Sequence, residues 1–205
     1  MPALTAALAS GARVGAAGSS AWRLPHVGLR FSAMSVGLGR GVLVFKPIDL
    51  DAHGHVCIAF RRDTFMSSFG WDGFFARDGD NGENYLKRLR AHSSRFPDGN
   101  VHAWDDGEIV GQLEMRVLDD PCRGHVSLFY LTEPVRGSGA GGDLQRYAMR
   151  FMRSQGVGTA QLNVSPTNAR ALSYYRKHGW KDCGLRPGRD DVHLLEHSLT
   201  AAAPL

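Results

Sequence analysis

The chain has no acidic side chain in its first forty residues, although it carries 24 basic and 20 acidic residues in all. Its only charges before Lys46 are four arginines, and the first acid is Asp49. Once those four arginines are set aside, the remaining 20 basic and 20 acidic residues cancel. The net charge of +4 therefore belongs to the N-terminal segment, and we expect the domain to have no nucleic-acid partner.

Cysteine is scarce and long apolar runs are absent. Cys57, Cys122 and Cys183 form no C-x-x-C pair, so a reduced, cytoplasmic location is predicted and no zinc site is expected. The histidine pairs 53/55 and 193/197 lack the spacing of a metal motif, and we predict no metal. No run approaches the roughly 18 apolar residues that cross a membrane, so we expect no membrane association.

Composition divides the chain of 205 residues into three parts. Residues 1–40 are rich in Ala, Gly and Ser, which bury too little apolar surface to fold alone, and they are predicted to be a flexible extension. Whether this segment is a leader or precedes a natural start at Met34 is left open. Residues 41–199 suit one domain with a sizeable core, and residues 200–205 form a tail.

Apolar spacing within the domain predicts strands and helices in the order βααβββαβαββ. The expected elements are a strand at 41–48, helices at 49–69 and 81–96, a hairpin of 101–104 with 109–118, a strand at 126–131, a helix at 143–152, a strand at 159–164, a helix at 166–178, and strands at 180–185 and 192–197. Asp51 is the expected N-cap of the first helix, and Asp63 interrupts its apolar stripe, which suggests a bend. The fold class is α/β (α+β).

A glycine-rich turn follows the strand at 126–131 and opens a helix. Glycine brings main-chain N–H groups close to a ligand, and a helix N-terminus suits a phosphate. The turn lacks the Gly-Lys-Ser/Thr ending of a Walker A loop. Gly137, Gly139 and Gly142 match G-x-G-x-x-G, but no acid lies between Asp143 and Asp182 to hold a ribose, which disfavours a dinucleotide-binding oxidoreductase. The pattern R-x-x-G-x-G fits every position of 136–141.

A second motif lies downstream, where Asn168, Ala171, Tyr175, Gly179 and Trp180 fit N-x-x-A-x-x-x-Y-x-x-x-G-F with Trp in place of Phe. With both motifs in this order, the chain resembles the GNAT family of N-acetyltransferases from about residue 42 to 198. The resemblance implies a single domain with a mixed, largely antiparallel central sheet flanked by helices. It also implies acetyl transfer from acetyl-coenzyme A, a co-substrate, to a primary amine by direct attack in a ternary complex.

The resemblance also implies a set of cofactor-binding residues. The turn amides would hold the pyrophosphate, the open edge of the central strand would pair with the pantetheine arm, and the asparagine of the second motif would contact the cofactor. This requires the sheet to splay after the central strand. The residues are Tyr130, Leu131, Thr132, Arg136, Gly137, Ser138, Gly139, Ala140, Gly141, Gly142 and Asn168.

Tyr175 matches the tyrosine that in this family donates a proton to the leaving thiolate, whereas Tyr174 suits a packing role. For the general base, Glu114 is the preferred candidate, with Glu133, His125 or a chain of water molecules as alternatives. Aromatic and acidic residues between 61 and 96, the loop at 70–75 among them, suit a cationic small-molecule or peptide amine, or else form a solvated face. A CoA-binding regulatory module without catalysis is an alternative function, and a homodimer is left open.

Overall fold

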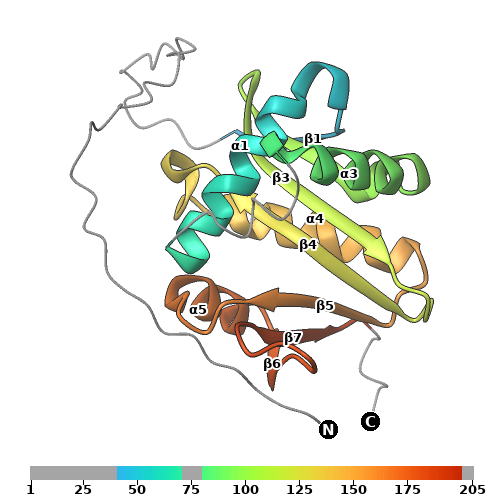
Figure 1. Cartoon of the computed structure of the whole chain (residues 1–205), viewed down its shortest axis with the longest axis vertical. Helices are drawn as coiled ribbons and strands as arrows, with labels where there is room; N and C mark the ends of the chain where they lie inside the picture. The colour runs from blue at the N-terminus through green and yellow to red at the C-terminus, as the bar shows by residue number, and fades with distance from the viewer. Residues whose placement is uncertain (1–40, 71–79, 200–205) are drawn as a thin grey trace, which may run out of the picture. The chain divides into compact units, whose positions relative to one another are not determined.

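The computed structural model describes residues 41–70 and 80–199 (Figure 1). The aromatic loop at 71–75 and two of the expected acceptor-region acids, Asp72 and Asp78, lie outside the described residues. Among the described residues, no helix combines the length and apolar character needed to cross a membrane.

The elements follow one another in the predicted order βααβββαβαββ, which is confirmed. They are β1 (Val44–Pro47), α1 (Leu50–Phe69), η1 (Asp80–Gly82), α3 (Glu83–Arg95), η2 (Pro97–Gly99), β2 (Asn100–Asp105), β3 (Glu108–Val117), β4 (Arg123–Leu131), η3 (Glu133–Val135), α4 (Ala140–Ser154), β5 (Thr159–Val164), α5 (Ala169–Lys177), β6 (Lys181–Leu185) and β7 (His193–Ser198).

The strands form one seven-stranded sheet in the order β1-β2-β3-β4-β5-β7-β6. Every neighbouring pair is antiparallel except β4 with β5, which run parallel. A parallel pair needs a crossover between its strands, and α4 supplies it. The sheet is therefore mixed and largely antiparallel, as predicted.

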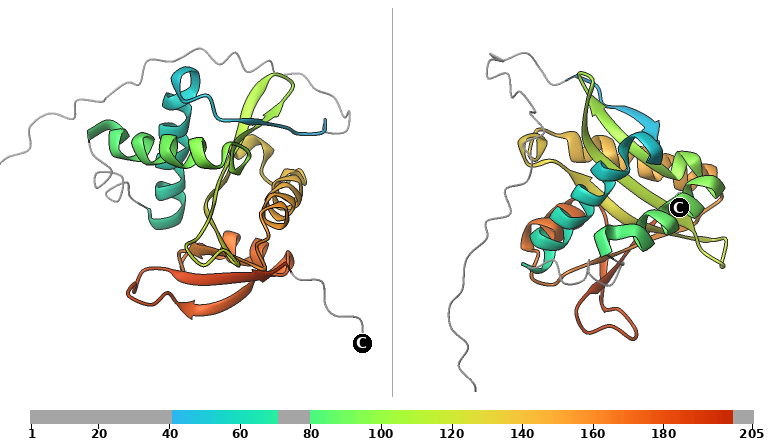
Figure 2. Two further views of the ribbon diagram at one scale, coloured as in Figure 1. Left: turned by 90° about the vertical axis from the view of Figure 1, so that its right-hand side faces the viewer. Right: turned by 45° about the horizontal axis from the view of Figure 1, so that its top comes forward.

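Helices cover both faces of the sheet (Figure 2, left). On one face, α1 and α3 pack around Cys57, Tyr85 and Leu89, and Phe60 of α1 contacts Leu128 and Tyr130 of β4. On the other face, α4 and α5 contribute apolar side chains to the main core together with the strands; these side chains include Leu144, Ala148, Met152, Leu172 and Tyr175. The sheet thus separates two helical layers. The region between β4 and β5 lies within the sheet, between these two layers.

Two predictions for α1 were wrong. Its N-cap is Asp49, whose carboxylate accepts hydrogen bonds from the amides of Asp51 and Ala52 at 3.0 Å. The helix departs from helical geometry at His53, with φ −123°, and continues through Asp63. The backbone of Asp63 is helical, and its carboxylate accepts from side chains of β4 and of the following turn.

Candidate functional site

The sheet opens between β4 and β5. The two strands pair only from Arg123–Thr159 to Val126–Leu162, although β4 continues to Leu131 (Figure 1). Beyond this point Ser127 is the extra residue of a β-bulge, because Glu114 pairs with Leu128 while Met115 pairs with Val126. The predicted splay is thus present, and the second half of β4 has an edge that β5 does not cover.

The direction of the backbone decides which β4 residues face this opening. The amide of Thr132 donates to the carbonyl of Val110 on β3 at 2.9 Å. In an antiparallel pair, alternate residues direct their N–H and C=O groups to the same neighbour, so Tyr130 also faces β3. Phe129 and Leu131 therefore face the opening. Of the predicted residues, Leu131 fits a pairing role through its amide, since its carbonyl accepts from Arg136. Tyr130 and Thr132 do not fit this role through their backbones, and Phe129 was missed.

The glycine-rich turn lies at the end of this edge. Gly137 and Gly139 have φ of +90° and +93°, where a side chain would be strained. Gly139 is the N-cap of α4 and provides no side-chain cap. The amides of Ala140 and Gly141 begin the helix without intrahelical acceptors, whereas those of Gly142 and Ser138 are bonded within the turn. Together with the helix dipole, the unpaired amides form a site suited to a phosphate.

Tyr174 of α5 packs against the glycine-rich turn. Its hydroxyl donates to the carbonyl of Gly141 at 2.6 Å, and its ring stacks on His178 with centroids 4.0 Å apart. A Cβ at Gly141 would lie 2.8 Å from the Tyr174 ring. Glycine at 141 is thus required by this close packing, and Tyr174 has the packing role expected of it.

The arginine of the turn connects it to α1. Arg136 Nε donates to the carbonyl of Leu131 at 2.7 Å, and its Nη2 donates to Asp63 at 2.8 Å. The Tyr130 hydroxyl donates to the same Asp63 oxygen at 2.7 Å. The amide of Arg136 bonds to the carbonyl of Glu133. The side chain of Arg136 therefore holds the turn against β4 and α1. Its amide is bonded within the turn and is not one of the unpaired donors.

Asn168 is the N-cap of α5. Its side-chain oxygen accepts from the amide of Ala171 at 3.0 Å, and its Nδ2 lies 3.4 Å from Ser68 Oγ of α1. The structure gives it a capping role that its residue type at a helix start already indicates. Its predicted contact with a cofactor stays a prediction.

Tyr175 is buried in the core layer of α4 and α5, where it contacts Phe129, Tyr174 and Trp180 edge-on. Its hydroxyl makes no hydrogen bond to any residue in the described part of the chain. Burial, followed by the nearby Tyr174, raises the pKa of Tyr175 above its usual value. The hydroxyl therefore keeps its proton at neutral pH and has a proton to donate.

Glu114 lies on the opposite face of the sheet, in the layer of α1 and α3. It pairs across the strands with Leu128, directly after the bulge. Its carboxylate accepts from the Tyr85 hydroxyl at 2.6 Å and from Gln112 Nε2 at 2.8 Å. Burial raises the pKa of Glu114, while Arg61, Tyr85, Gln112 and Arg88 act to lower it. A raised pKa makes this carboxylate a stronger base than an exposed glutamate.

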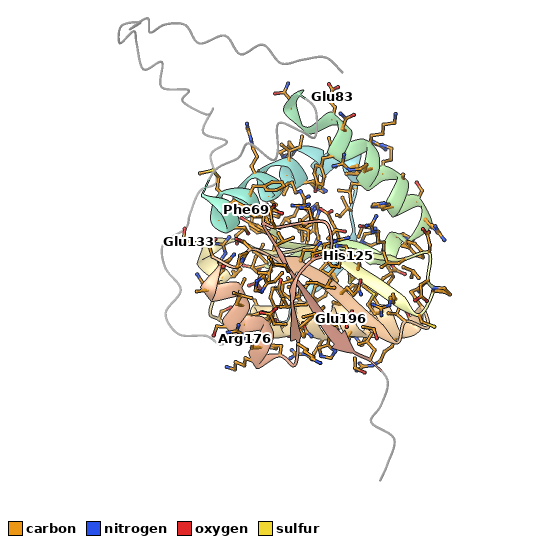
Figure 3. All side chains as sticks on the ribbon, turned by 60° about the horizontal axis from the view of Figure 1, so that its bottom comes forward. Phe69, Glu83, His125, Glu133, Arg176 and Glu196 are labelled. Atoms are coloured by element: carbon orange, nitrogen blue, oxygen red, sulfur yellow. The ribbon has the colours of Figure 1, made fainter. Side chains whose placement is uncertain are left out.

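The alternative bases lie in different surroundings. His125 is buried where β4 and β5 still pair, and burial, with Arg116 and Arg186, lowers its pKa to about 4. Glu133 is an exposed residue of η3. Figure 3 shows His125 well separated from Glu133, which lies at the margin of the domain. His125 lies where β4 and β5 are still paired, whereas Glu114 pairs with Leu128 next to the bulge where the sheet opens, so the geometry favours Glu114 over His125.

A cationic cavity of about 320 Å³ lies one helical turn beyond the glycines. Its lining residues are Gln145, Arg146, Met149, Arg150, Arg153, His178 and His197. Arg146 pairs with Asp143, and its guanidinium lies 3.4 Å from where a Cβ of Gly142 would be. The described residues contain no cluster of His, Cys, Asp or Glu suited to a metal ion.

Sequence reasoning missed Tyr85, Gln112, Phe129 and Arg146 as parts of the site. It named Asp63 among the acids that would suit a cationic amine, but not as the partner of Arg136 and Tyr130. The four missed residues had no sequence signal, because their roles depend on which strand faces which helix.

Comparison with known proteins agrees with this architecture. Residues 60–180 match the sequence model of the Acetyltransferase (GNAT) family. Streptothricin acetyltransferase of Streptomyces lavendulae is 44% identical over 107 residues, which are 52% of this chain and 54% of that protein. The chain thus matches about half the length of this curated relative.

Two solved structures have the same fold. The PaiA N-acetyltransferase of Thermoplasma acidophilum, in complex with coenzyme A, has a TM-score of 0.63 at 17% identity and covers 76% of this chain and 98% of its own. A GNAT-family acetyltransferase of Staphylococcus aureus Mu50 has a TM-score of 0.62 at 15% identity and covers 77% and 99%. With more than half of its residues matched by the family model, this chain belongs to the Acetyltransferase (GNAT) family.

Proposed function

We propose that this protein transfers an acetyl group from acetyl-coenzyme A to a primary amine within a ternary complex. The observation that carries the proposal is the opening between β4 and β5, with the uncapped N-terminus of α4 at its end. One feature suits an extended chain with amide groups, and the other suits a pyrophosphate. Coenzyme A has both parts in this order.

The cofactor would lie with its pyrophosphate against the amides of Ala140 and Gly141 and its pantetheine arm along Phe129 and Leu131. The cationic cavity beyond Arg146 suits the phosphate-bearing nucleotide end, because its lining includes arginines and histidines. The thioester would then lie near the bulge at Ser127, where the sheet opens.

Acid and base would act from opposite faces of the sheet. The neutral amine attacks the thioester carbonyl carbon, and the C–S bond breaks as the new C–N bond forms. Glu114, on the face of α1 and α3, takes the proton that the amine nitrogen loses. Tyr175, on the face of α4 and α5, gives a proton to the departing thiolate. The products are an N-acetyl amine and coenzyme A.

For the acceptor, we propose a cationic amine of the streptothricin class. The support is the 44% identity over 107 residues to a streptothricin acetyltransferase, together with the carboxylates of Asp63 and Glu114 on the α1 side of the opening. A cation is attracted to a site whose carboxylates are only partly neutralised. Peptide amines are the competing acceptors that the assay must include.

Three further expectations belong to this proposal. We expect residues 41–199 to suffice for acetyl transfer, with residues 1–40 and 200–205 dispensable. We expect the protein to act in the cytoplasm and without nucleic acid. Its assembly, a homodimer among the options, is measurable by light scattering.

Binding and transfer are tested separately. Thermal unfolding is measured with acetyl-coenzyme A, coenzyme A and NADPH, and we expect stabilisation by the first two alone. A free-thiol assay then compares streptothricin, a polyamine, lysine and a peptide N-terminus. Stabilisation by NADPH alone would contradict the proposal, and cofactor binding without transfer to any amine would indicate the regulatory-module alternative.

A matched pair of variants locates the cofactor. Gly139→Ala and Gly188→Ala both place a side chain at positive φ, +93° and +76°, with no atom within 4 Å of the new Cβ. Their backbone strain is therefore comparable, but only Gly139 lies at the N-terminus of α4. We expect Gly139→Ala to weaken acetyl-coenzyme A binding at least tenfold more than Gly188→Ala. Equal affinities in the two variants would place the cofactor elsewhere.

A further inference from the structure

A connected group of polar side chains is buried beneath α1 and α3. Gln112 bridges two parts of it: its Oε1 lies 3.1 Å from His102 Nε2, and its Nε2 donates to the Tyr85 hydroxyl at 3.1 Å and to Glu114 at 2.8 Å. Cys57 Sγ lies 3.5 Å from His102 Nε2. All five side chains are buried. They come from α1, α3, β2 and β3, so only the tertiary structure brings them together.

The protonation state of His102 sets the directions of these hydrogen bonds. Burial lowers the pKa of His102 to about 4, so the ring is neutral at pH 7 and one nitrogen carries its proton. A proton on Nε2 is donated to Gln112 Oε1, which leaves both protons of the Gln112 amide for Glu114 and Tyr85. The Tyr85 hydroxyl accepts from Gln112 and donates to Glu114 at 2.6 Å.

The two oxygens of Glu114 are therefore unequal. Oε1 accepts from both Tyr85 and Gln112, whereas Oε2 accepts no hydrogen bond from the described residues. Arg61 and Arg88 provide counter-charge to Glu114, and Arg61 Nη1 donates to the Ser127 carbonyl at the bulge at 3.3 Å. One oxygen of the carboxylate is fixed, and the other keeps its lone pairs.

We propose that Tyr85, oriented by Gln112, is a positioning residue for Glu114: it anchors Oε1 so that Oε2 is the oxygen offered to the acceptor amine. The proposal rests on the proposed acetyl transfer. It assigns a role to α3, which contributes no residue to either sequence motif. It also excludes Cys57 as an acyl carrier, because that thiol is fully buried and burial, followed by Glu114, raises its pKa to about 12.

If these five side chains served only to stabilise the fold, apolar side chains would fill the same space with a smaller loss of hydration free energy. A buried carboxylate loses its hydration, and hydrogen bonds and a counter-charge repay that loss only when the geometry is good. Here two donors and the charges of Arg61 and Arg88 act on a single carboxylate, on the residue that pairs with Leu128 next to the bulge of β4. A network of this kind is expected where one oxygen must be held in a fixed direction.

The test compares two variants, each of which removes one tyrosine hydroxyl. Tyr85→Phe deletes the donor to Glu114, and Tyr147→Phe deletes a hydroxyl that donates to the Asp98 carbonyl on the far side of the sheet. We expect Tyr85→Phe to lower kcat about tenfold, a typical loss for a misplaced base, with the KM for acetyl-coenzyme A unchanged. The acid limb of the pH profile of kcat/KM should move to higher pH, because the lost donor favoured the carboxylate. Tyr147→Phe should change neither.

A second measurement does not depend on activity. The Glu114 carboxyl carbon is titrated by 13C NMR in the wild type and in Tyr85→Phe, and its midpoint should rise in the variant. If Tyr85→Phe does not fold, Gln112→Met is used and should raise the midpoint as well. An unshifted midpoint overturns the role of Tyr85. A wild type that acetylates no amine overturns the proposed function instead, so the two failures are distinguishable.

Discussion

Gly141 and Gly142 are neighbours in the first turn of α4, yet alanine should destabilise the protein at position 141 and not at position 142. At Gly141 the new Cβ would lie 2.8 Å from Tyr174 Cε2, whereas at Gly142 the nearest atom is Arg146 Nη1 at 3.4 Å. The arginine is exposed and can move. The Tyr174 ring cannot move freely, because it stacks on His178 at 4.0 Å and its hydroxyl is bonded to Gly141 itself.

The magnitudes follow from these contacts. Overpacking at Gly141 costs about 1–3 kcal/mol, and the strained Tyr174 hydrogen bond costs about 1 kcal/mol more. Replacing glycine by alanine in a helix returns roughly 0.5–1 kcal/mol at either position. We therefore expect Gly142→Ala to be neutral or slightly stabilising and Gly141→Ala to be less stable than Gly142→Ala by about 2–4 kcal/mol.

The assay is urea unfolding of both variants without cofactor, followed by thermal unfolding. The midpoints should differ by roughly 5–12 °C for a domain of this size. Adding Tyr174→Phe tests the cause, because it removes the hydroxyl that lies 3.2 Å from the new Cβ and should narrow the difference between the glycine variants. Equal stabilities for Gly141→Ala and Gly142→Ala would refute the reasoning, since the ring would then have room to move.

Three more predictions concern the proposed acid Tyr175, the Asp63–Arg136 ion pair and the pH dependence of stability. Tyr175→Phe should lower kcat about 10- to 100-fold with little change in coenzyme A affinity, measured by steady-state kinetics and calorimetry; an unchanged kcat would mean that another group protonates the thiolate. Asp63→Asn should lower the free energy of unfolding by about 1 kcal/mol, because its pair with Arg136 is partly exposed, and 1 M salt should shrink the difference; a salt-independent loss would argue against an ionic bridge. Stability should fall as pH drops below about 6.5, because burial lowers the pKa of both His102 and His125 to about 4, so the unfolded chain binds these protons first. By pH 5 this costs about 2 kcal/mol for His125, and His125→Gln should show a correspondingly smaller loss between pH 7 and pH 5 in urea unfolding; an identical loss would show that His125 is not buried as a neutral ring.

Local patterns in the sequence predicted the order of elements and the glycine-rich turn. Apolar spacing depends on the period of each element and needs no knowledge of neighbours. Glycine at 137 and 139 reflects a backbone conformation that is closed to other residues, so the turn was readable from composition alone. Errors arose at ends and interruptions, as with the cap at Asp49 and the kink at His53.

The packing of the elements decided the rest. Which residues of β4 face the opening depends on the register with β3 and on the bulge at Ser127, and a shift of one residue reverses every direction. This is why Tyr130 and Thr132 were named together with Leu131, whereas the residues that face the opening are Phe129 and Leu131. The two hydrogen-bond donors to Glu114 likewise come from residues 2 and 29 positions away in the chain.

The sequence by itself determined the fold class, the family resemblance and the position of the glycine-rich turn, because each depends on residues that are close together in the chain. The tertiary structure alone decided that Glu114 and Tyr175 lie on opposite faces of the sheet and that Tyr85 anchors one carboxylate oxygen. Hydrogen bonds of this kind join side chains from four elements, and their geometry exists only once those elements have packed.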